Sequence, residues 1–170
     1  MPEATAPKAK NLGQSAPVKL NETHDFSTFE CGQASIDANV KRALKAQAAK
    51  DAVIYVICRN GTLQVLGFYT LTIGAVMRDQ APKKLQRNAP NQYPVTVLGR
   101  LGVDRTIQDQ GVAIALLQDA IERSISASEA VGSRALLVHA LDQGLADFYK
   151  KYACFIESPV SPLTLMLPLQ

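Results

Sequence analysis

The chain of 170 residues has few cysteines, and their placement excludes two common roles. There are three, Cys31, Cys58 and Cys154, an odd number at wide spacings and outside any C-x-x-C pattern. Neither a disulfide framework nor a zinc site is therefore predicted. Either His24 or His139 could in principle join a cysteine at a metal, but nothing in the sequence places them together, and no metal is assigned.

Long apolar runs are also missing. A helix needs about 20 consecutive apolar residues to span a bilayer, and no segment approaches that length, so no membrane span is expected. Residues 1–10 contain lysines and are followed by Asn11, Gly13 and Gln14. A secretory signal would need a continuous apolar segment there, so we expect a cytoplasmic protein.

The net charge is small, at +3 for the whole chain. A value this low does not identify a nucleic-acid binder, and the distribution of the charges has to decide. Basic residues gather in two places, either of which could contact phosphates or be an ordinary solvated surface. They are Lys41, Arg42, Lys45 and Lys50 in an expected helix, and Arg78, Lys83, Lys84 and Arg87 in a polar segment.

Composition and length indicate one globular domain. The sequence is 47% hydrophobic and 19% charged, which is typical of a globular protein, and the length fits a single domain with one active site. Residues 1–17 are rich in Ala, Pro, Lys and Ser and lack periodicity, which predicts a disordered N-terminal arm. The folded domain is expected over 18–170.

Periodicity in the first half predicts a helix and a hairpin. From Ser35, apolar residues recur at helical spacing. The β-branched stretch 51–59 ends in the turn pair Asn60-Gly61 and is followed by a β-rich stretch over 63–73, which predicts two antiparallel strands. Residues 77–93 are polar and contain prolines, and we expect a surface excursion there with room for a short helix over 82–87.

The second half alternates strands and helices. A strand is expected over 95–103, an amphipathic helix over 111–124, a buried strand over 135–140, a helix over 145–152 and a closing strand over 163–169. These elements predict an α/β (α+β) fold whose central sheet is mixed, mostly antiparallel and flanked by helices.

The turn from the strand at 95–103 into the next helix contains Gln108, Gly111 and Ala113. Small residues let backbone N–H groups approach a ligand, and a helix N-terminus carries unpaired donors and partial positive charge. The physical interpretation is an anion site able to hold a diphosphate. A glycine before a helix can also simply make a tight turn, and spacing alone leaves that alternative open.

The pattern Gln-x-x-Gly-x-Ala at these three positions resembles the acetyl-CoA pyrophosphate loop of GNAT-superfamily N-acetyltransferases, whose usual form is Arg or Gln, two residues, Gly, one residue, then Gly or Ala. The surrounding sequence is more specific: V-L-G-R-L-G-V-D-R before the loop, A-L-L-V-H-A-L after the helix, then D-F-Y-K-K-Y and P-L-T-L-M-L-P-L. Upstream, H-D-F-S-T-F-E-C-G and A-P-K-K-L-Q-R-N add to the likeness. From about residue 18 to residue 169 the chain is similar to the GNAT toxins of bacterial type II toxin–antitoxin systems, which acetylate the amino group of aminoacyl-tRNA.

This resemblance implies a GNAT fold, acetyl-CoA as co-substrate, aminoacyl-tRNA as acceptor, a block of translation, a ribbon-helix-helix antitoxin and a homodimer. The implied cofactor contacts come from the end of the strand and from the loop: Leu101, Gly102, Val103, Gln108, Asp109, Gln110, Gly111, Val112 and Ala113. The polar segment with Arg78, Lys83, Lys84 and Arg87 also resembles the toxin branch, and these residues are expected to contact RNA.

The expected general acid is Tyr149. Transfer requires that an amine attack a thioester carbonyl, that the oxyanion be stabilised, and that the departing CoA thiolate receive a proton. A tyrosine hydroxyl is a neutral donor at pH 7, and the resembled family has its acid at the tyrosine of a Phe-Tyr pair, here Phe148-Tyr149. By spacing alone, Tyr149 would be a packed aromatic residue on an amphipathic helix.

Two departures from the family pattern keep alternatives open. Relatives commonly have Gly and then Lys or Arg where this chain has Asp109 and Gln110, and an acidic side chain turned toward a pyrophosphate would repel it. The turn after the catalytic helix is Tyr152-Ala153-Cys154 instead of Phe-Gly-Phe, with Cys154 expected to be a buried thiol and not a nucleophile. The alternatives are an acetyltransferase for a protein N-terminus or small amine, and a catalytically weak CoA-binding module.

Overall fold

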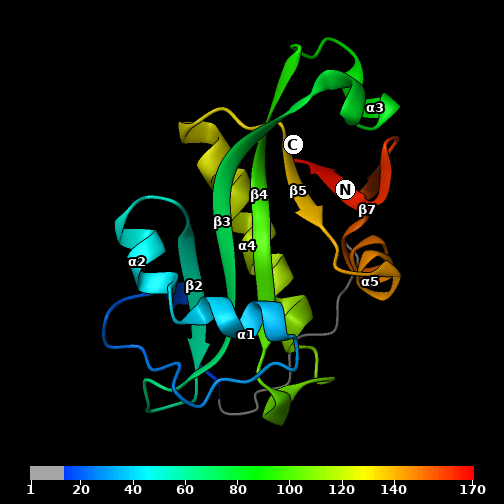
Figure 1. The fold of residues 1–170 in the computed structure, drawn as a ribbon. Coiled ribbons are helices and arrows are strands. Elements are labelled where there is room, and N and C mark those ends of the chain that lie inside the picture. The colour runs from blue at the N-terminus through cyan, green and yellow to red at the C-terminus, as the bar shows by residue number, and fades with distance from the viewer. Residues whose placement is uncertain (1–13) are drawn as a thin grey trace. The chain divides into compact units, whose positions relative to one another are not determined.

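Figure 1 shows the computed structural model of the chain, which describes residues 14–170. The described chain forms two compact units. The first contains Ile73–Leu98 and Ile121–Gln170, and the second contains residues 14–72 and Gly99–Ala120. Strands β3 (Val65–Met77) and β4 (Gln92–Val103) and helix α4 (Val112–Ala130) contribute residues to both units. A single domain over 18–170 stays a prediction.

The predicted N-terminal arm, residues 1–17, lies mostly outside the described residues. Its described end is hydrogen-bonded to the main chain of β2 (Val53–Cys58). The N–H of Ser15 donates to the carbonyl of Cys58 at 2.7 Å, and the N–H of Cys58 donates to the hydroxyl oxygen of Ser15 at 3.0 Å. Disorder in the remainder of the arm stays a prediction.

In the second unit the strands follow the order β1-β2-β3-β4. β1 (Val18–Lys19) pairs antiparallel with β2, and β2 pairs antiparallel with β3. Asn60-Gly61 lies in the connection between β2 and β3, and Gly61 has a φ of 73°, which glycine adopts without steric cost. The predicted hairpin is confirmed, although β3 continues beyond the expected end at Ile73.

The helix expected from Ser35 is two short helices, α1 (Ala34–Val40) and α2 (Ala43–Ala48), which lie on one face of β2 and β3 (Figure 1). The chain turns at the exposed pair Lys41-Arg42. Val40 and Ala43 on either side of the turn are both buried. The turn therefore keeps Val40 and Ala43 inward while Lys41 and Arg42 face water.

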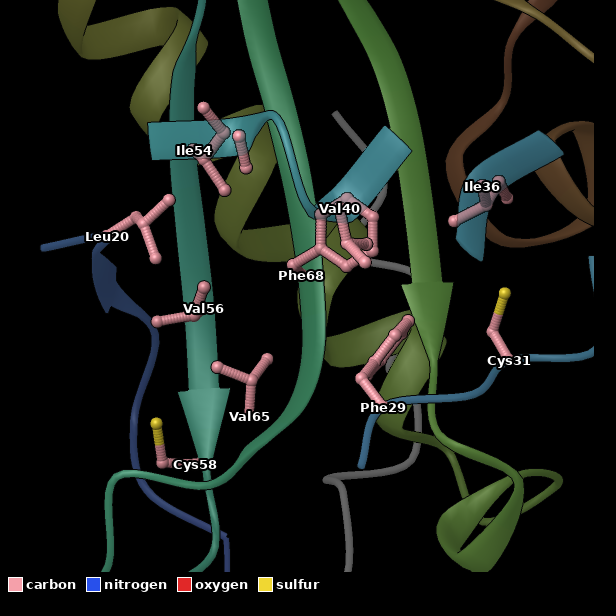
Figure 2. Packing of buried hydrophobic residues seen from close by; sticks show 11 residues of the cluster. Leu20, Phe29, Cys31, Ile36, Val40, Ile54, Val56, Cys58, Val65 and Phe68 are labelled. Atoms are coloured by element: carbon pink, nitrogen blue, oxygen red, sulfur yellow. The ribbon is translucent and has the colours of Figure 1, made fainter. Parts of the chain in front are cut away.

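Three aromatic rings pack together in the second unit's core, and Figure 2 shows two of them, Phe29 and Phe68, among the buried residues. The rings of Phe26, Phe29 and Phe68 meet edge to face with centroids 5.4–5.9 Å apart, a geometry that aromatic rings favour. Buried residues from α1, α2 and the strands surround them: Leu20, Cys31, Ile36, Val40, Ala43, Ile54, Val56, Cys58 and Val65. Burying one large apolar side chain contributes roughly 1.5–3 kcal/mol, so this cluster holds the segment before α1 firmly against the strands.

In the first unit the strand order is β3-β4-β5-β7-β6. β4 pairs in parallel with β5 (Ala135–His139), from Val95↔Ala135 to Leu98↔Val138. β7 (Ser161–Pro168) pairs antiparallel with β5 and with β6 (Ile156–Ser158). A parallel pair among antiparallel neighbours confirms the predicted α+β class with a mixed, mostly antiparallel sheet.

Helices α4 and α5 (Gln143–Ala153) confirm two predicted helices and extend beyond their expected ends. α5 begins after Asp142, whose carboxylate accepts a hydrogen bond from the N–H of Leu145 at 2.9 Å, a typical N-cap. Among the helices of residues 14–170, none combines the length and apolarity that crossing a bilayer requires.

The polar segment over 77–93 contains a 3₁₀ turn, η1 (Arg78–Gln80), and the short helix α3 (Lys83–Gln86). Although many of its side chains are exposed, Ala81, Ala89 and Tyr93 are buried and share a core cluster with residues of β4, β5 and β7. The N–H of Arg78 also donates to the carbonyl of Asn91 at 2.9 Å. The expected surface excursion is therefore a packed part of the first unit, with its charged side chains outward.

Candidate functional site

The predicted anion loop connects β4 to α4 in the second unit. After β4 the chain makes a 3₁₀ turn, η2 (Arg105–Ile107), and then adopts left-handed backbone at Asp109 (φ 60°) and Gly111 (φ 82°). The N–H of Ala115 donates to the carbonyl of Gly111 at 3.1 Å, the first bond of the α4 ladder. The N–H groups of residues 112–114 precede that bond and have no acceptor within the helix. They form the positive end of α4, where an anion is favoured.

Gln108 directs its side-chain amide into the protein. Nε2 donates to the carbonyl of Cys31 at 2.6 Å and to the carbonyl of Val103 at 2.8 Å. Both amide hydrogens are therefore used inside the chain. This residue shapes the loop, and main-chain groups are left to meet an anion.

Asp109 and Gln110 are both exposed. Left-handed backbone is tolerated by Asp better than by most residues other than Gly and Asn, which explains why Asp can stand at position 109, where the resembled pattern has Gly. Water and salt screen an exposed carboxylate, so the charge of Asp109 opposes a bound anion less than a buried charge would.

The end of β4 carries the other expected cofactor residues. Leu101 is half-buried, and Gly102 and Val103 are buried. A Cβ at Gly102 would lie 3.1 Å from side-chain atoms of both Ile36 and Phe68, so the close packing of α1 and β3 needs glycine here. Gly102 and Val103 are packed in the core, so a ligand could contact the main chain of the strand here.

Tyr149 lies on α5 in the first unit and is only 7% exposed. Its ring meets those of Phe148 and Phe155 edge to face, with centroids 5.4 and 5.5 Å away. Burial raises the pKa of Tyr149 to about 12, so the hydroxyl is protonated at neutral pH and is a hydrogen-bond donor. Its aromatic neighbours fix the direction of the ring. The alternative interpretation from spacing alone, a packed aromatic residue, predicted the same surroundings.

The hydroxyl of Tyr149 reaches the surface. Among the described residues it makes no hydrogen bond to another group of the chain, and no buried side-chain polar atom there lacks a partner. The two observations together mean that the oxygen is accessible to solvent although the ring is buried. A ligand could therefore accept a hydrogen bond from Tyr149.

The expected RNA contacts, Arg78, Lys83, Lys84 and Arg87, are exposed in the first unit. Arg78 also has a structural role, because its Nη1 donates to the carbonyl of Ala89 at 3.2 Å. The other three follow one another closely along α3 and its end. They present positive charge to water on a segment whose buried alanines hold it in place.

His139 and Cys154, which the sequence also raised, lie in the first unit. The imidazole Nδ1 of His139 lies 3.0 Å from the hydroxyl oxygen of Thr164. Cys154 is exposed and ends α5 in left-handed backbone (φ 57°), so the expectation of a buried thiol there was wrong. Left-handed backbone is common at the end of a helix and turns the chain away from it. Within residues 14–170 no group of His, Cys, Asp and Glu side chains could hold a metal ion.

The sequence analysis did not identify Asp104, which is 5% exposed at the start of the loop. Its carboxylate accepts from the N–H and hydroxyl of Thr106 at 3.0 and 2.8 Å, and from the N–H of Glu30 at 3.0 Å. The signal available in the sequence is an Asp two residues before a Thr, a pattern that makes local turns. The contact with Glu30, far away in the chain, leaves no such signal.

Comparisons with known proteins agree with this structure. No protein-family model matches the chain. A tRNA-acetylating toxin of Mycobacterium tuberculosis is 41% identical over 156 residues, which cover 91% of this chain and 92% of the relative. The structure of AtaT complexed with acetyl-methionyl-tRNAfMet has a TM-score of 0.83 at 31% identity and covers 91% of this chain and 94% of that one. A mutant AtaT toxin bound to the C-terminus of the antitoxin AtaR and acetyl-CoA has a TM-score of 0.76 at 28% identity, with 92% and 93% covered.

Fold and matches together define the class of protein, an N-acetyltransferase with the GNAT fold. The relative that is 41% identical over most of both chains identifies the family within this class. The chain belongs to the family of bacterial tRNA-acetylating toxins.

Proposed function

We propose that this protein transfers the acetyl group of acetyl-CoA to the amino group of aminoacyl-tRNA and thereby blocks translation. The observation that carries the proposal is the loop before α4, where left-handed backbone at Asp109 and Gly111 precedes the free N–H groups of a long helix. A diphosphate fits such a site because main-chain donors and the helix dipole act on it together.

Acetyl-CoA binds through main-chain groups in this proposal. The diphosphate contacts the loop from Gln108 to Ala113, and the pantetheine arm pairs with the backbone at Leu101, Gly102 and Val103. In support, the register between β4 and β5 ends at Leu98↔Val138, while β4 itself continues to Val103. Past Leu98 the backbone of β4 is therefore not paired with β5 and can offer donors and acceptors on that edge, while the carbonyl of Val103 already accepts from Gln108.

Tyr149 acts as the general acid. The neutral amine of the acceptor attacks the thioester carbonyl, a C–N bond forms, and the C–S bond breaks to release CoA thiolate. The hydroxyl of Tyr149 donates its hydrogen bond to this sulfur and passes it the proton. Water accepts the proton that the amine loses, and a proton from solvent then restores the Tyr149 hydroxyl. Because the pKa of Tyr149 is raised to about 12 by burial, proton transfer should accompany the growth of charge on sulfur instead of preceding it.

The acceptor is charged tRNA. Arg78, Lys83, Lys84 and Arg87 contact its phosphates, an interaction that is independent of base sequence and weakened by salt. In support, these side chains are exposed, and the related toxin AtaT was solved with acetyl-methionyl-tRNAfMet.

The protein is further proposed to be a cytoplasmic homodimer that a ribbon-helix-helix antitoxin neutralises. The cytoplasm is where charged tRNA is found, and a related toxin binds the C-terminus of the antitoxin AtaR. Sedimentation of the protein alone and with the product of a short neighbouring reading frame would test both partners.

The deciding experiment is acetyl transfer from radiolabelled acetyl-CoA to a pool of charged tRNAs, with uncharged tRNA and free amino acids as controls. Label on charged tRNA alone is the expected result and identifies the amino acid. Label on a protein N-terminus or a small amine would mean that this amine, and not charged tRNA, is the acceptor. Bound acetyl-CoA without transfer to any amine would indicate a CoA-binding module.

A further inference from the structure

We propose that Asp104 and the side chain of Gln108 are positioning residues that attach the diphosphate loop to residues 30–31 and so set the direction of the loop's N–H groups. This inference rests on the proposed binding of acetyl-CoA. It assigns Gln108 a role through its side chain that does not require contact with the ligand, and it assigns a role to Asp104 that the sequence did not indicate.

Asp104 holds the entrance of the loop. One carboxylate oxygen accepts from the N–H and the hydroxyl of Thr106, which closes the turn that begins η2. The other accepts from the N–H of Glu30 at 3.0 Å. The N–H of Asp104 donates to the carbonyl of Leu66 at 2.8 Å, so the residue also stays fixed beside β3. A carboxylate that is 5% exposed and accepts this many bonds has a single available orientation.

Gln108 holds the exit of η2. Its amide bridges the carbonyls of Val103, at the end of β4, and Cys31, before α1. The next residue, Asp109, already has left-handed backbone. The bridge therefore fixes the point from which the chain turns toward the N-terminus of α4.

Residues 30–31 form a firm support for both contacts. The N–H of Arg105 donates to the carbonyl of Glu30 at 2.9 Å, and the N–H of Cys31 donates to the carboxylate of Asp37 on α1 at 3.0 Å. The Glu30–Arg105 ion pair adds little, because both side chains are about 60% exposed and screened by water. Main-chain hydrogen bonds of residues 30–31 and the side chains of Asp104 and Gln108 thus fix the loop in place before any ligand binds.

When the donors are already fixed, binding an anion does not require the loop to be ordered, so the binding free energy is not reduced by that loss of conformational entropy. Losing either attachment should therefore weaken binding of the diphosphate. The reacting thioester lies at the far end of the pantetheine arm from the diphosphate, so its chemistry should change little. The expected signature is a higher KM for acetyl-CoA with kcat preserved.

The sharpest variant is Gln108→Glu, which keeps the size of the side chain but removes both N–H donors. It places a carboxylate oxygen against the carbonyls of Cys31 and Val103, so we expect the KM for acetyl-CoA to rise by about tenfold or more and kcat to change by less than about twofold. Gln108→Arg restores donors and should return KM to within about threefold of the original value. Asp104→Asn, which turns an amide N–H group toward donors, should behave like Gln108→Glu.

The control is Gln47→Ala. Gln47 lies in the same unit, and its side-chain amide also makes two hydrogen bonds to main-chain groups, the carbonyl of Leu20 and the N–H of Ile54. It should change neither kinetic constant. Circular dichroism checks that each variant folds. If Asp104→Asn does not fold, Gln108→Glu alone tests the proposal, because residue 108 is exposed.

A second substrate separates loop geometry from general damage. S-acetylpantetheine has the reacting thioester but no diphosphate, so in Gln108→Glu and Asp104→Asn kcat/KM with this substrate should fall far less than kcat/KM with acetyl-CoA. Equal losses with both substrates, or an unchanged KM for acetyl-CoA in Gln108→Glu, would overturn the positioning role. If the original protein binds no acetyl-CoA in calorimetry, the proposed function fails instead.

Discussion

The hydroxyl of Tyr69 on β3 donates a hydrogen bond to the carboxylate of Asp119 on α4, inside the second unit. Tyr69 has no exposed surface, and its ring stacks on that of Tyr55 with centroids 5.2 Å apart. The helix whose first turn faces the proposed ligand is therefore attached to the sheet by a part-buried polar contact as well as by apolar packing.

Tyr69→Phe should destabilise the protein. The ring and its stacking remain, but a half-buried carboxylate loses a donor, and a hydrogen bond to a charged group contributes about 1.5–3 kcal/mol. Urea unfolding followed by circular dichroism measures this as a lower midpoint at unchanged slope. An unaltered midpoint would mean that the contact contributes nothing to stability.

Tyr149→Phe should abolish most turnover while the Kd for acetyl-CoA stays the same, because the variant loses only the proton donor. We expect kcat to fall by about a hundredfold or more. Tyr152→Phe, one turn further along α5, is the matched control and should keep its activity. With the pKa of Tyr149 at about 12, ionisation of this hydroxyl should not lower turnover anywhere between pH 6 and 9. Unchanged kcat in Tyr149→Phe would remove the residue from its role.

Replacing Lys83, Lys84 and Arg87 together by Ala should weaken tRNA binding and flatten its dependence on salt. Each lost phosphate contact lowers the slope of log K against log salt concentration by about 0.7–0.9. The double variant Lys83→Arg with Lys84→Arg keeps the charges and should keep the slope. Filter binding at several salt concentrations gives the slopes, and identical slopes in the Ala variant would place the RNA elsewhere.

Asp104 should make folding stability fall at acid pH. Burial alone would raise the pKa of this carboxyl, but hydrogen bonds from Thr106 and Glu30 and the charge of Arg59 hold the pKa below its ordinary value. The folded state then binds this proton less readily than the unfolded state, so the contribution is complete above about pH 4 and is lost as pH falls through the folded-state pKa. Asp104→Asn should therefore lower Tm at pH 7 and reduce the decline of Tm between pH 6 and 3. An equal decline in both proteins would contradict this.

Thiol reagents should label one cysteine rapidly in the native protein. Cys154 is exposed, whereas Cys31 and Cys58 are buried. Burial, together with the hydrogen bond and charge of Asp37, raises the pKa of Cys31 to about 11, and burial raises the pKa of Cys58. Both therefore lack the thiolate form that reacts. Mass spectrometry after brief alkylation should find the modification on Cys154, and rapid modification of Cys58 would show that β2 opens.

Much of the fold was predictable because the signals are local. The β-branched composition and the Asn60-Gly61 pair predicted the β2–β3 hairpin, and helical spacing predicted α4 and α5. The break between α1 and α2 was not predicted, since apolar spacing continues across Lys41-Arg42 and only the three-dimensional packing of Val40 and Ala43 determines the turn. β1 and β6 are too short to leave a periodic signal.

The site was predictable only in part. The spacing of Gln108 and Gly111 indicated an anion loop, and the backbone there has the left-handed conformation that such a loop uses. The inward direction of the Gln108 amide could not be predicted, because its partner at Cys31 lies 77 residues away in the chain. Asp104 was not identified for the same reason, because its contact Glu30 is also far away in the chain. Whether Tyr149 and the basic residues act as proposed depends on ligands, and their roles stay predictions.

The internal use of the Gln108 side chain has a consequence for how this loop can evolve. Because an anion would meet main-chain N–H groups, identity at positions 109 and 110 is constrained mainly by backbone shape, and position 109 accepts the few residues that tolerate left-handed backbone. Related chains can therefore diverge between Gln108 and Gly111 while keeping the same ligand. A motif search that demands glycine at the second position of this loop would overlook them.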